Sequence, residues 1–295
     1  RAGDVFKYLG DSPLSNPNPT STTDGNYLLD QDFKDTSKWQ EVNLGEAAAE
    51  VRAYSQNSSV DAAGDLSLVA TSNQMIDAFI FAGSVALSGG GTAGVSLSGA
   101  GASADNRIYT KVQALIDGDG STGIIANNIA LTATDNASIS ATVGTASLAA
   151  GFGLAGVAIS VGVSLGYNEV SNIVQASIAN ADNGITSRTA DLRLLAQSNA
   201  VITSTTVAAS AAIGAGLVGV GFAGAGADAQ NVIKTQNLAY ISASKVTGAR
   251  DLVIQSANES TITAKIASVA AAVGGGAVGV GVSIGSSTAE NLIGW

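Results

Sequence analysis

The stretch "AVGGGAVGVGVSIG", from Ala272 to Gly285, decides how the chain folds, because it has no charged residue and consists almost entirely of Gly, Ala and Val. Three structures fit this composition: a membrane helix of small residues, a flexible linker, or a strand covered on both faces. Val278, Val280 and Val282 alternate with small residues, and a period of two is typical of a β-strand. The stretch therefore predicts a strand with one branched face and one small face.

The same pattern occurs four times along the chain, as an internal repeat. Each copy begins G-x-G, carries Gly at its sixth position and ends in Asn. The recurring glycines are Gly94, Gly156, Gly219 and Gly279, and the terminal asparagines are Asn106, Asn168, Asn231 and Asn291. A second anchor lies about forty residues before each asparagine, at Asp65, Asn128, Asp191 and Asp251. Several anchors in register predict four repeats of about 60 to 63 residues.

These repeats predict an all-β protein, as a β-solenoid or a related stacked-sheet fold. Clusters of Gly, Asn, Asp and Ser, such as "DGDGSTG", supply tight corners between short strands. We expect the repeat domain to span residues 46–295. Residues 1–45 hold all three prolines and show no trace of the repeat, and this predicts a separate small β-hairpin module.

Composition excludes several classes of function. The net charge of −10 leaves no basic patch for nucleic acid. The chain has no His and no Cys, which removes thiol nucleophiles, imidazole-dependent triads and the usual zinc sites. Arg193 and Lys265 lie in different repeats with no carboxylate cluster around either, so we expect no enzyme, although a polysaccharide-acting β-helix enzyme is an alternative.

A membrane protein rich in Gly and Ala is a further alternative. Residues 136–168 and 194–227 are free of charge and longer than the ~20 residues of a spanning helix. Scattered Ser and Thr, scarce Leu, the lack of a Lys/Arg asymmetry and above all the period of two argue against helices. We therefore expect no membrane span.

A strand with a small second face can be approached closely by another layer, either within the molecule or from a neighbour. We expect the Gly/Ala faces and the unpaired strand edges to mediate self-association.

The pattern "DLxLxA…ITAT…GxGxxGVGVSVG…N…N" resembles the repeat arrays of giant bacterial secreted and cell-surface proteins, the filamentous-haemagglutinin-like β-solenoid adhesins. The resemblance covers about residues 46–295. It implies export to the cell surface and a role in adhesion or in an extracellular fibre. The chain lacks a complete calcium-binding nonapeptide repeat, so the resemblance carries over no calcium dependence.

In the first 45 residues, "GDVFKYLG" and "FKDTSKWQEV" are loosely similar to small chitin- or cellulose-binding modules. The residues that match are Asp4, Val5, Tyr8, Gly10, Trp39 and Val42. Tyr8 and Trp39 are the candidates for stacking on a surface glycan. The alternative is that Phe6, Tyr8, Phe33 and Trp39 form a mini-core.

Two further sets of residues are candidate sites. Asp117, Asp119 and Asp182 lie in Gly-containing turns, which favour ordinary turn chemistry, with a calcium loop as the alternative. We expect no cofactor unless calcium binds there. The four repeat asparagines predict a side-chain ladder along the solenoid. The sequence thus favours a self-associating structural subunit of an extracellular bacterial filament, sheath or adhesive fibre. A carbohydrate-binding adhesin is the alternative.

Overall fold

The computed structural model describes residues 6–9, 38–41 and 48–294. The chain divides into two units, residues 1–48 and 49–295. In the first unit, β1 (Phe6–Tyr8) and β2 (Trp39–Glu41) form an antiparallel pair that places Tyr8 opposite Trp39. Phe33, one of the expected mini-core residues, lies outside the described residues, as do Asp4, Val5, Gly10 and Val42.

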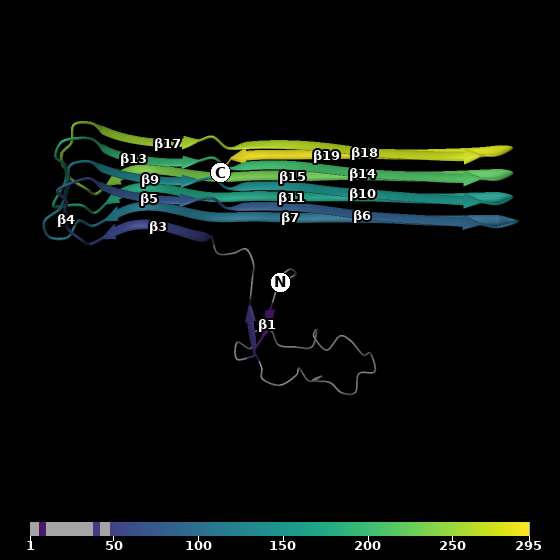
Figure 1. Ribbon diagram of the computed structural model, residues 1–295, viewed down its shortest axis with the longest axis horizontal. Coiled ribbons are helices and arrows are strands. Elements are labelled where there is room, and N and C mark those ends of the chain that lie inside the picture. The colour runs from purple at the N-terminus through teal and green to yellow at the C-terminus, as the bar shows by residue number, and fades with distance from the viewer. Residues whose placement is uncertain (1–5, 10–37, 42–47, 295) are drawn as a thin grey trace. The chain divides into compact units, whose positions relative to one another are not determined.

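The second unit is a parallel β-solenoid (Figure 1). Each complete coil contains four strands in the same order: a long strand, a strand of three residues, a strand of seven residues and a strand of fifteen residues. The strands are β3 (Ala49–Gln56), β4 (Val60–Asp61), β5 (Leu66–Ser72), β6 (Met75–Gly89), β7 (Ala93–Asp117), β8 (Ile124–Ala126), β9 (Ile129–Asp135), β10 (Ser138–Phe152), β11 (Ala155–Ala179), β12 (Ile185–Ser187), β13 (Leu192–Ser198), β14 (Val201–Ala215), β15 (Val218–Ser242), β16 (Val246–Gly248), β17 (Leu252–Asn258), β18 (Thr261–Gly275) and β19 (Val278–Gly294).

Equivalent strands of successive coils pair in register, so each becomes a strand of the same sheet. The sheets have the orders β3-β7-β11-β15-β19, β6-β10-β14-β18, β4-β8-β12-β16 and β5-β9-β13-β17. The predicted all-β fold of stacked parallel repeats is confirmed. The anchors Asp65, Asn128, Asp191 and Asp251 each directly precede a strand, β5, β9, β13 and β17. A search of the described residues finds no apolar helix long enough to cross a bilayer.

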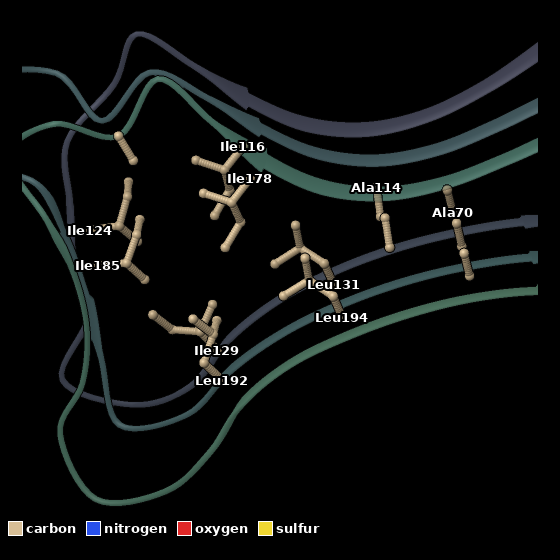
Figure 2. Close-up of a cluster of buried hydrophobic side chains, with 14 of the residues drawn as sticks. Ala70, Ala114, Ile116, Ile124, Ile129, Leu131, Ile178, Ile185, Leu192 and Leu194 are labelled. Atoms are coloured by element: carbon tan, nitrogen blue, oxygen red, sulfur yellow. The ribbon is translucent and has the colours of Figure 1, made fainter. Parts of the chain in front are cut away.

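The broad part of each coil, which we call the base, has a conventional apolar core. It lies between the carboxyl-terminal part of the long strands and the strands that follow them (Figure 2). Ile116, Ile178, Leu131 and Leu194 are fully buried there. In-register stacking places Ile178 beside Ile116 and Leu194 beside Leu131. Each coil therefore fills the core layer of the next.

The remaining part, which we call the blade, consists of residues 75–104, 138–166, 201–229 and 261–289. In it the fifteen-residue strands face the first half of the following long strands across a short turn (Figure 1). Its interior is lined by small side chains such as Ala149, Ala158 and Ser160, all fully buried, whereas Val161 and Val163 point outward and are 44% and 39% exposed. Near the base the interior still holds Ile139 and Val143, but beyond Val143 toward the tip the polarity of a normal two-sheet core is inverted.

This arrangement corrects one expectation. The sequence predicts Gly/Ala faces that are available for self-association, but in the structure these faces meet each other inside the blade. A Cβ on Gly162 would lie 2.7 Å from the carbonyl oxygen of Ala209 in the facing sheet. The repeat glycines Gly94, Gly156, Gly219 and Gly279 lie at equally tight places, where a Cβ would overlap backbone oxygens. The outer faces of the blade carry mostly Val, Ile and Leu, with glycines such as Gly99 and Gly224 at some positions.

Candidate functional site

The four repeat asparagines form a continuous ladder along the stack. Asn106 Nδ2 donates to Asn168 Oδ1 at 2.9 Å, and Asn168 donates in turn to Asn231 at 2.8 Å. Asn231 completes the ladder by donating to Asn291 at 2.9 Å. Because Asn168 and Asn231 are fully buried, these bonds satisfy amides that water cannot reach. All donors point the same way along the stack.

A second ladder runs parallel to the first, between the seven-residue and fifteen-residue strands. Asn199 donates to Asn136, and Asn136 donates to Asn73, both at 2.8 Å. These residues were not among the sequence predictions, although each follows the previous one by 63 positions. Their spacing was the signal that would have found them.

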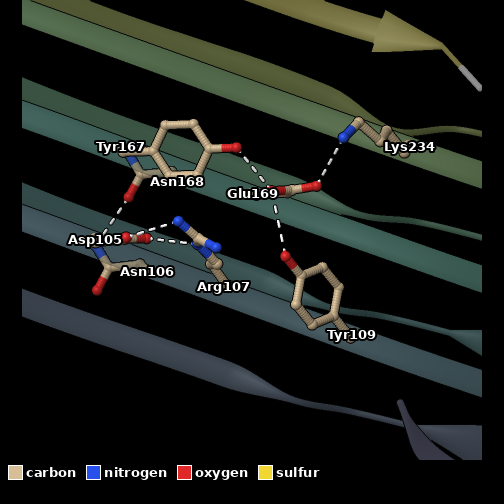
Figure 3. A network of polar contacts seen from close by, with 8 residues as sticks. All are labelled: Asp105, Asn106, Arg107, Tyr109, Tyr167, Asn168, Glu169 and Lys234. Atoms are coloured by element: carbon tan, nitrogen blue, oxygen red, sulfur yellow. Dashed lines mark hydrogen bonds and ion pairs between the residues drawn. The ribbon is translucent and has the colours of Figure 1, made fainter. Parts of the chain in front are cut away.

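A polar network lies on the outer face of the long-strand sheet, where the blade meets the base (Figure 3). Its centre is Glu169, whose side chain is 8% exposed. Lys234 Nζ lies 2.9 Å from Glu169 Oε1, and Tyr167 Oη donates to Oε2 at 2.7 Å. Tyr109 donates to the same oxygen at 3.3 Å. The four residues come from β7, β11 and β15, and the sequence predictions missed them because none recurs with the repeat.

Electrostatics fixes the protonation states in this network. Burial disfavours the charged form of Glu169, but hydrogen bonds from Lys234 and Tyr167 outweigh it and lower the pKa of the carboxyl. Burial, and then the hydrogen bond to Glu169, raise the pKa of Tyr167 to about 12. The hydrogen bond to Glu169 raises the pKa of Lys234. At neutral pH these shifts favour a charged Glu169–Lys234 pair with neutral phenols as hydrogen-bond donors.

Arg107 extends the network toward the first coils. Its guanidinium makes two hydrogen bonds of 2.8 Å to Asp105, and these chiefly raise the pKa of Arg107. Its Cζ lies 5.1 Å from the centre of the Tyr167 ring, within the range of a cation–π contact. Charged and aromatic side chains thus form a continuous belt across this sheet.

Two of the three candidate calcium residues accept hydrogen bonds from the next coil. Asp119 accepts a 2.7 Å hydrogen bond from the backbone N–H of Gly184 in the next coil. Asp117 accepts one of 2.7 Å from the side chain of Asn180. Asp182 is exposed. Within the described residues, no three His, Cys, Asp or Glu side chains gather as a metal site would require.

The candidate glycan-stacking residues contact each other. The ring centres of Tyr8 and Trp39 lie 5.2 Å apart with a tilt of 56°. Trp39 is only 6% exposed, so its ring is not presented to solvent as a stacking platform. The carbohydrate role of Tyr8 and Trp39 stays a prediction.

A buried carboxyl belongs to Asp135, the last residue of β9. Burial raises its pKa, against the effect of hydrogen bonds that include one from Asn172. Oδ1 of Asp135 has no hydrogen-bond partner, and the same holds for Oδ1 of Asn172. This polar layer lies between the core of the base and a smaller apolar cluster around Ile139.

Comparison of the chain with protein-family models, with curated proteins and with solved structures finds no match. The geometry of the described residues is therefore the basis for assigning a function.

Proposed function

We propose that the chain is a structural subunit that joins other copies of itself end to end, in an extracellular bacterial filament, sheath or adhesive fibre. The observation that carries the proposal is that, within the described residues, the outermost strands at both ends of the stack leave parallel edges without a partner in the same register. β16 to β19 and the last part of β15 form one end, and β3 to β6 and the first part of β7 form the other. The sequence resemblance to surface adhesins supports the extracellular setting.

The asparagine ladder makes the two ends complementary. Within the described residues, the Asn291 amide donates to no side chain, and the Asn106 carbonyl oxygen accepts from none. A second copy stacked on β19 would place its Asn106 where a fifth ladder member belongs. Because all ladder donors point the same way, this arrangement specifies head-to-tail joining.

The proposal makes no use of catalysis. Glu169 is the least exposed carboxylate of the polar network, and it accepts hydrogen bonds from Lys234, Tyr167 and Tyr109. Its environment supports a structural role.

A pair of adjacent residues on β19 gives the test. Ala289 lies on the inner face and Thr288 on the outer face, and both are exposed because β19 is the outermost described strand of its sheet. In the single chain, Ala289→Lys leaves its charge at an open end. In a head-to-tail assembly the same charge is buried without a partner, which is strongly unfavourable.

We expect the unsubstituted chain to form concentration-dependent polymers in sedimentation velocity and fibres in electron microscopy. Ala289→Lys stays monomeric with an unchanged β-type circular dichroism spectrum, and Thr288→Lys polymerises normally. A chain that remains monomeric at all concentrations, or that polymerises equally with Ala289→Lys, contradicts end-to-end joining.

A further inference from the structure

The outer surface of the blade is apolar on both faces and at its tip. On the long-strand sheet, the outward-facing side chains of β11 include Val157, Ile159, Val161 and Val163. On the opposite sheet the outward residues are likewise apolar, and those exposed include Phe81, Val85, Leu87, Phe152, Val207, Ile213, Val269 and Val273. The turns at the tip expose Leu154 and Leu217, at 58% and 61%. Exposed apolar surface of this extent marks a binding surface.

The charge-free part of the blade has a defined depth. No charged residue occurs between the level of Lys265 and the tip of the blade. The charge-free residues are 266–289 in the last coil and 81–104, 144–166 and 207–227 in the others. On β15 the boundary is Asp228. On β10 the charge-free stretch covers the whole strand, so Lys265 sets the boundary, and on β18 this part runs from Ile266 to Gly275, which is ten residues. At ~3.3 Å per residue it is about 30 Å deep. This equals the thickness of the hydrocarbon core of a bilayer, about 30 Å.

The boundary of this apolar band lies at the same level on both faces. A Cβ on Gly166 would lie 3.8 Å from Val143 in the facing strand, so Tyr167 and Thr142 occupy matching levels. Lys265 is aligned with Thr142 through Thr205, so it lies at this level on one face. On the other face Tyr167 lies at this level, and Arg107 and Tyr109 follow toward the base. Tyrosines and basic residues at the end of an apolar band are typical of the membrane–water interface.

The interior of the blade holds the hydroxyl groups that would be costly in hydrocarbon. Some of them bond one another, Thr145 with Ser164 at 3.0 Å and Ser147 with Ser160 at 2.8 Å, whereas the buried hydroxyls of Ser204, Thr206 and Ser210 have no hydrogen-bond partner. The backbone groups of the inner strands are paired within the parallel sheets. We infer that the blade inserts tip first into a lipid bilayer, with the base outside.

A bilayer explains the surface better than a second copy of the chain. A copy packed against one sheet would cover one outer face and leave the other face and the tip in water. Lipid covers both faces and the tip at once, and it also accounts for the belt. The period of two in the sequence argues against membrane-spanning helices. It does not argue against strands that carry apolar side chains on their outer face.

The inference rests on the proposed end-to-end joining in one respect. The outermost blade strands, β6 and β7 at one end and β18 and β19 at the other, have open edges whose backbone groups need partners in hydrocarbon. A head-to-tail assembly provides these partners, so we expect insertion by the assembled chains.

The test uses phosphatidylcholine vesicles and the absence of cysteine from the chain. A single Val161→Cys variant is labelled with a polarity-sensitive fluorophore, and Arg193→Cys, on the exposed face of the base, is the matched control. We expect the label at 161 to report an apolar environment when vesicles are added and the label at 193 to remain in water. Quenchers attached along the lipid chains should place the label at 161 inside the hydrocarbon.

Flotation with the same vesicles tests the apolar face itself. Val163→Lys adds a charge to the blade, and Gln236→Lys adds the same charge to the outer face of β15 in the base. Both leave the interior unchanged, so the circular dichroism spectrum should be retained. We expect Val163→Lys to float at least tenfold less and Gln236→Lys to float normally.

Three results overturn insertion. The first is equal flotation of Val163→Lys and the unsubstituted chain. The second is a label at 161 that already reports an apolar environment without vesicles and gives the same signal when vesicles are added. That result would show that copies of the chain cover each other. The third is a chain that polymerises in sedimentation but does not float, which leaves end-to-end joining intact. Flotation of the unsubstituted chain supports insertion, and loss of flotation in Ala289→Lys would show that insertion depends on assembly.

Discussion

Replacing Asn168 by Ala should destabilise the stack far more than the same change at the end of the ladder. Asn168 is fully buried and makes two ladder hydrogen bonds, of 2.9 Å to Asn106 and 2.8 Å to Asn231. Its removal leaves the buried Asn231 oxygen without a donor, which costs about 1–3 kcal/mol, and loses a second bond worth about 1 kcal/mol. We expect the free energy of unfolding to fall by about 2–4 kcal/mol.

Asn291→Ala is the matched control. Asn291 is exposed and makes one ladder bond, so water can replace it and we expect a loss of about 1 kcal/mol or less. Urea unfolding, followed by circular dichroism at concentrations where the chain is monomeric, measures both values. Equal losses for Asn168→Ala and Asn291→Ala would refute the claim that burial gives the ladder its strength.

Three further predictions follow from the same physics. Glu169 has a lowered pKa in the folded chain, so its contribution to stability is present above its unfolded value near 4.5 and is lost as the pH falls through its folded value. Glu169→Gln should therefore flatten the decline of the melting temperature in acid. Asp135 has a raised pKa, so its ionisation opposes folding at neutral pH, and Asp135→Asn should raise the melting temperature at pH 7 and have little effect below pH ~4. Gly156→Val should cost several kcal/mol, on the order of ~3 or more, because its Cβ would overlap the Ala215 carbonyl, whereas Gly224→Val, with nothing within 4 Å, should be neutral or stabilising in thermal unfolding.

Much of the fold could be predicted because the repeat constrains it. In-register stacking requires equivalent residues at equal spacing, so Asn106, Asn168 and Asn231 stand out as a set in the sequence alone. The period of two likewise separates the Val161 face from the Gly162 face. These are one-dimensional signals, and a solenoid is nearly a one-dimensional structure.

Which of the two faces is inside could not be predicted from alternation. Hydrophobic burial favours Val inside, but the interior of the blade is too narrow for it, as the 2.7 Å approach at Gly162 shows. The Glu169 network was hidden for a different reason. Glu169 is aligned with Arg107 and Val232, whereas its partners come from other positions on β7, β11 and β15, so they leave no repeating pattern.

Cross-linking tests end-to-end joining most directly. Ser103 and Thr288 occupy the same outward position in the first and last long strands, because Ser103, Leu165, Asp228 and Thr288 are aligned in turn. In a head-to-tail assembly they become neighbours about 4.8 Å apart, a spacing that a disulfide can bridge. The account predicts that the double variant Ser103→Cys with Thr288→Cys forms a ladder of disulfide-linked oligomers on oxidation, while neither single variant does. Dimers from either single variant alone, or no oligomers from the double variant at polymerising concentrations, would contradict it.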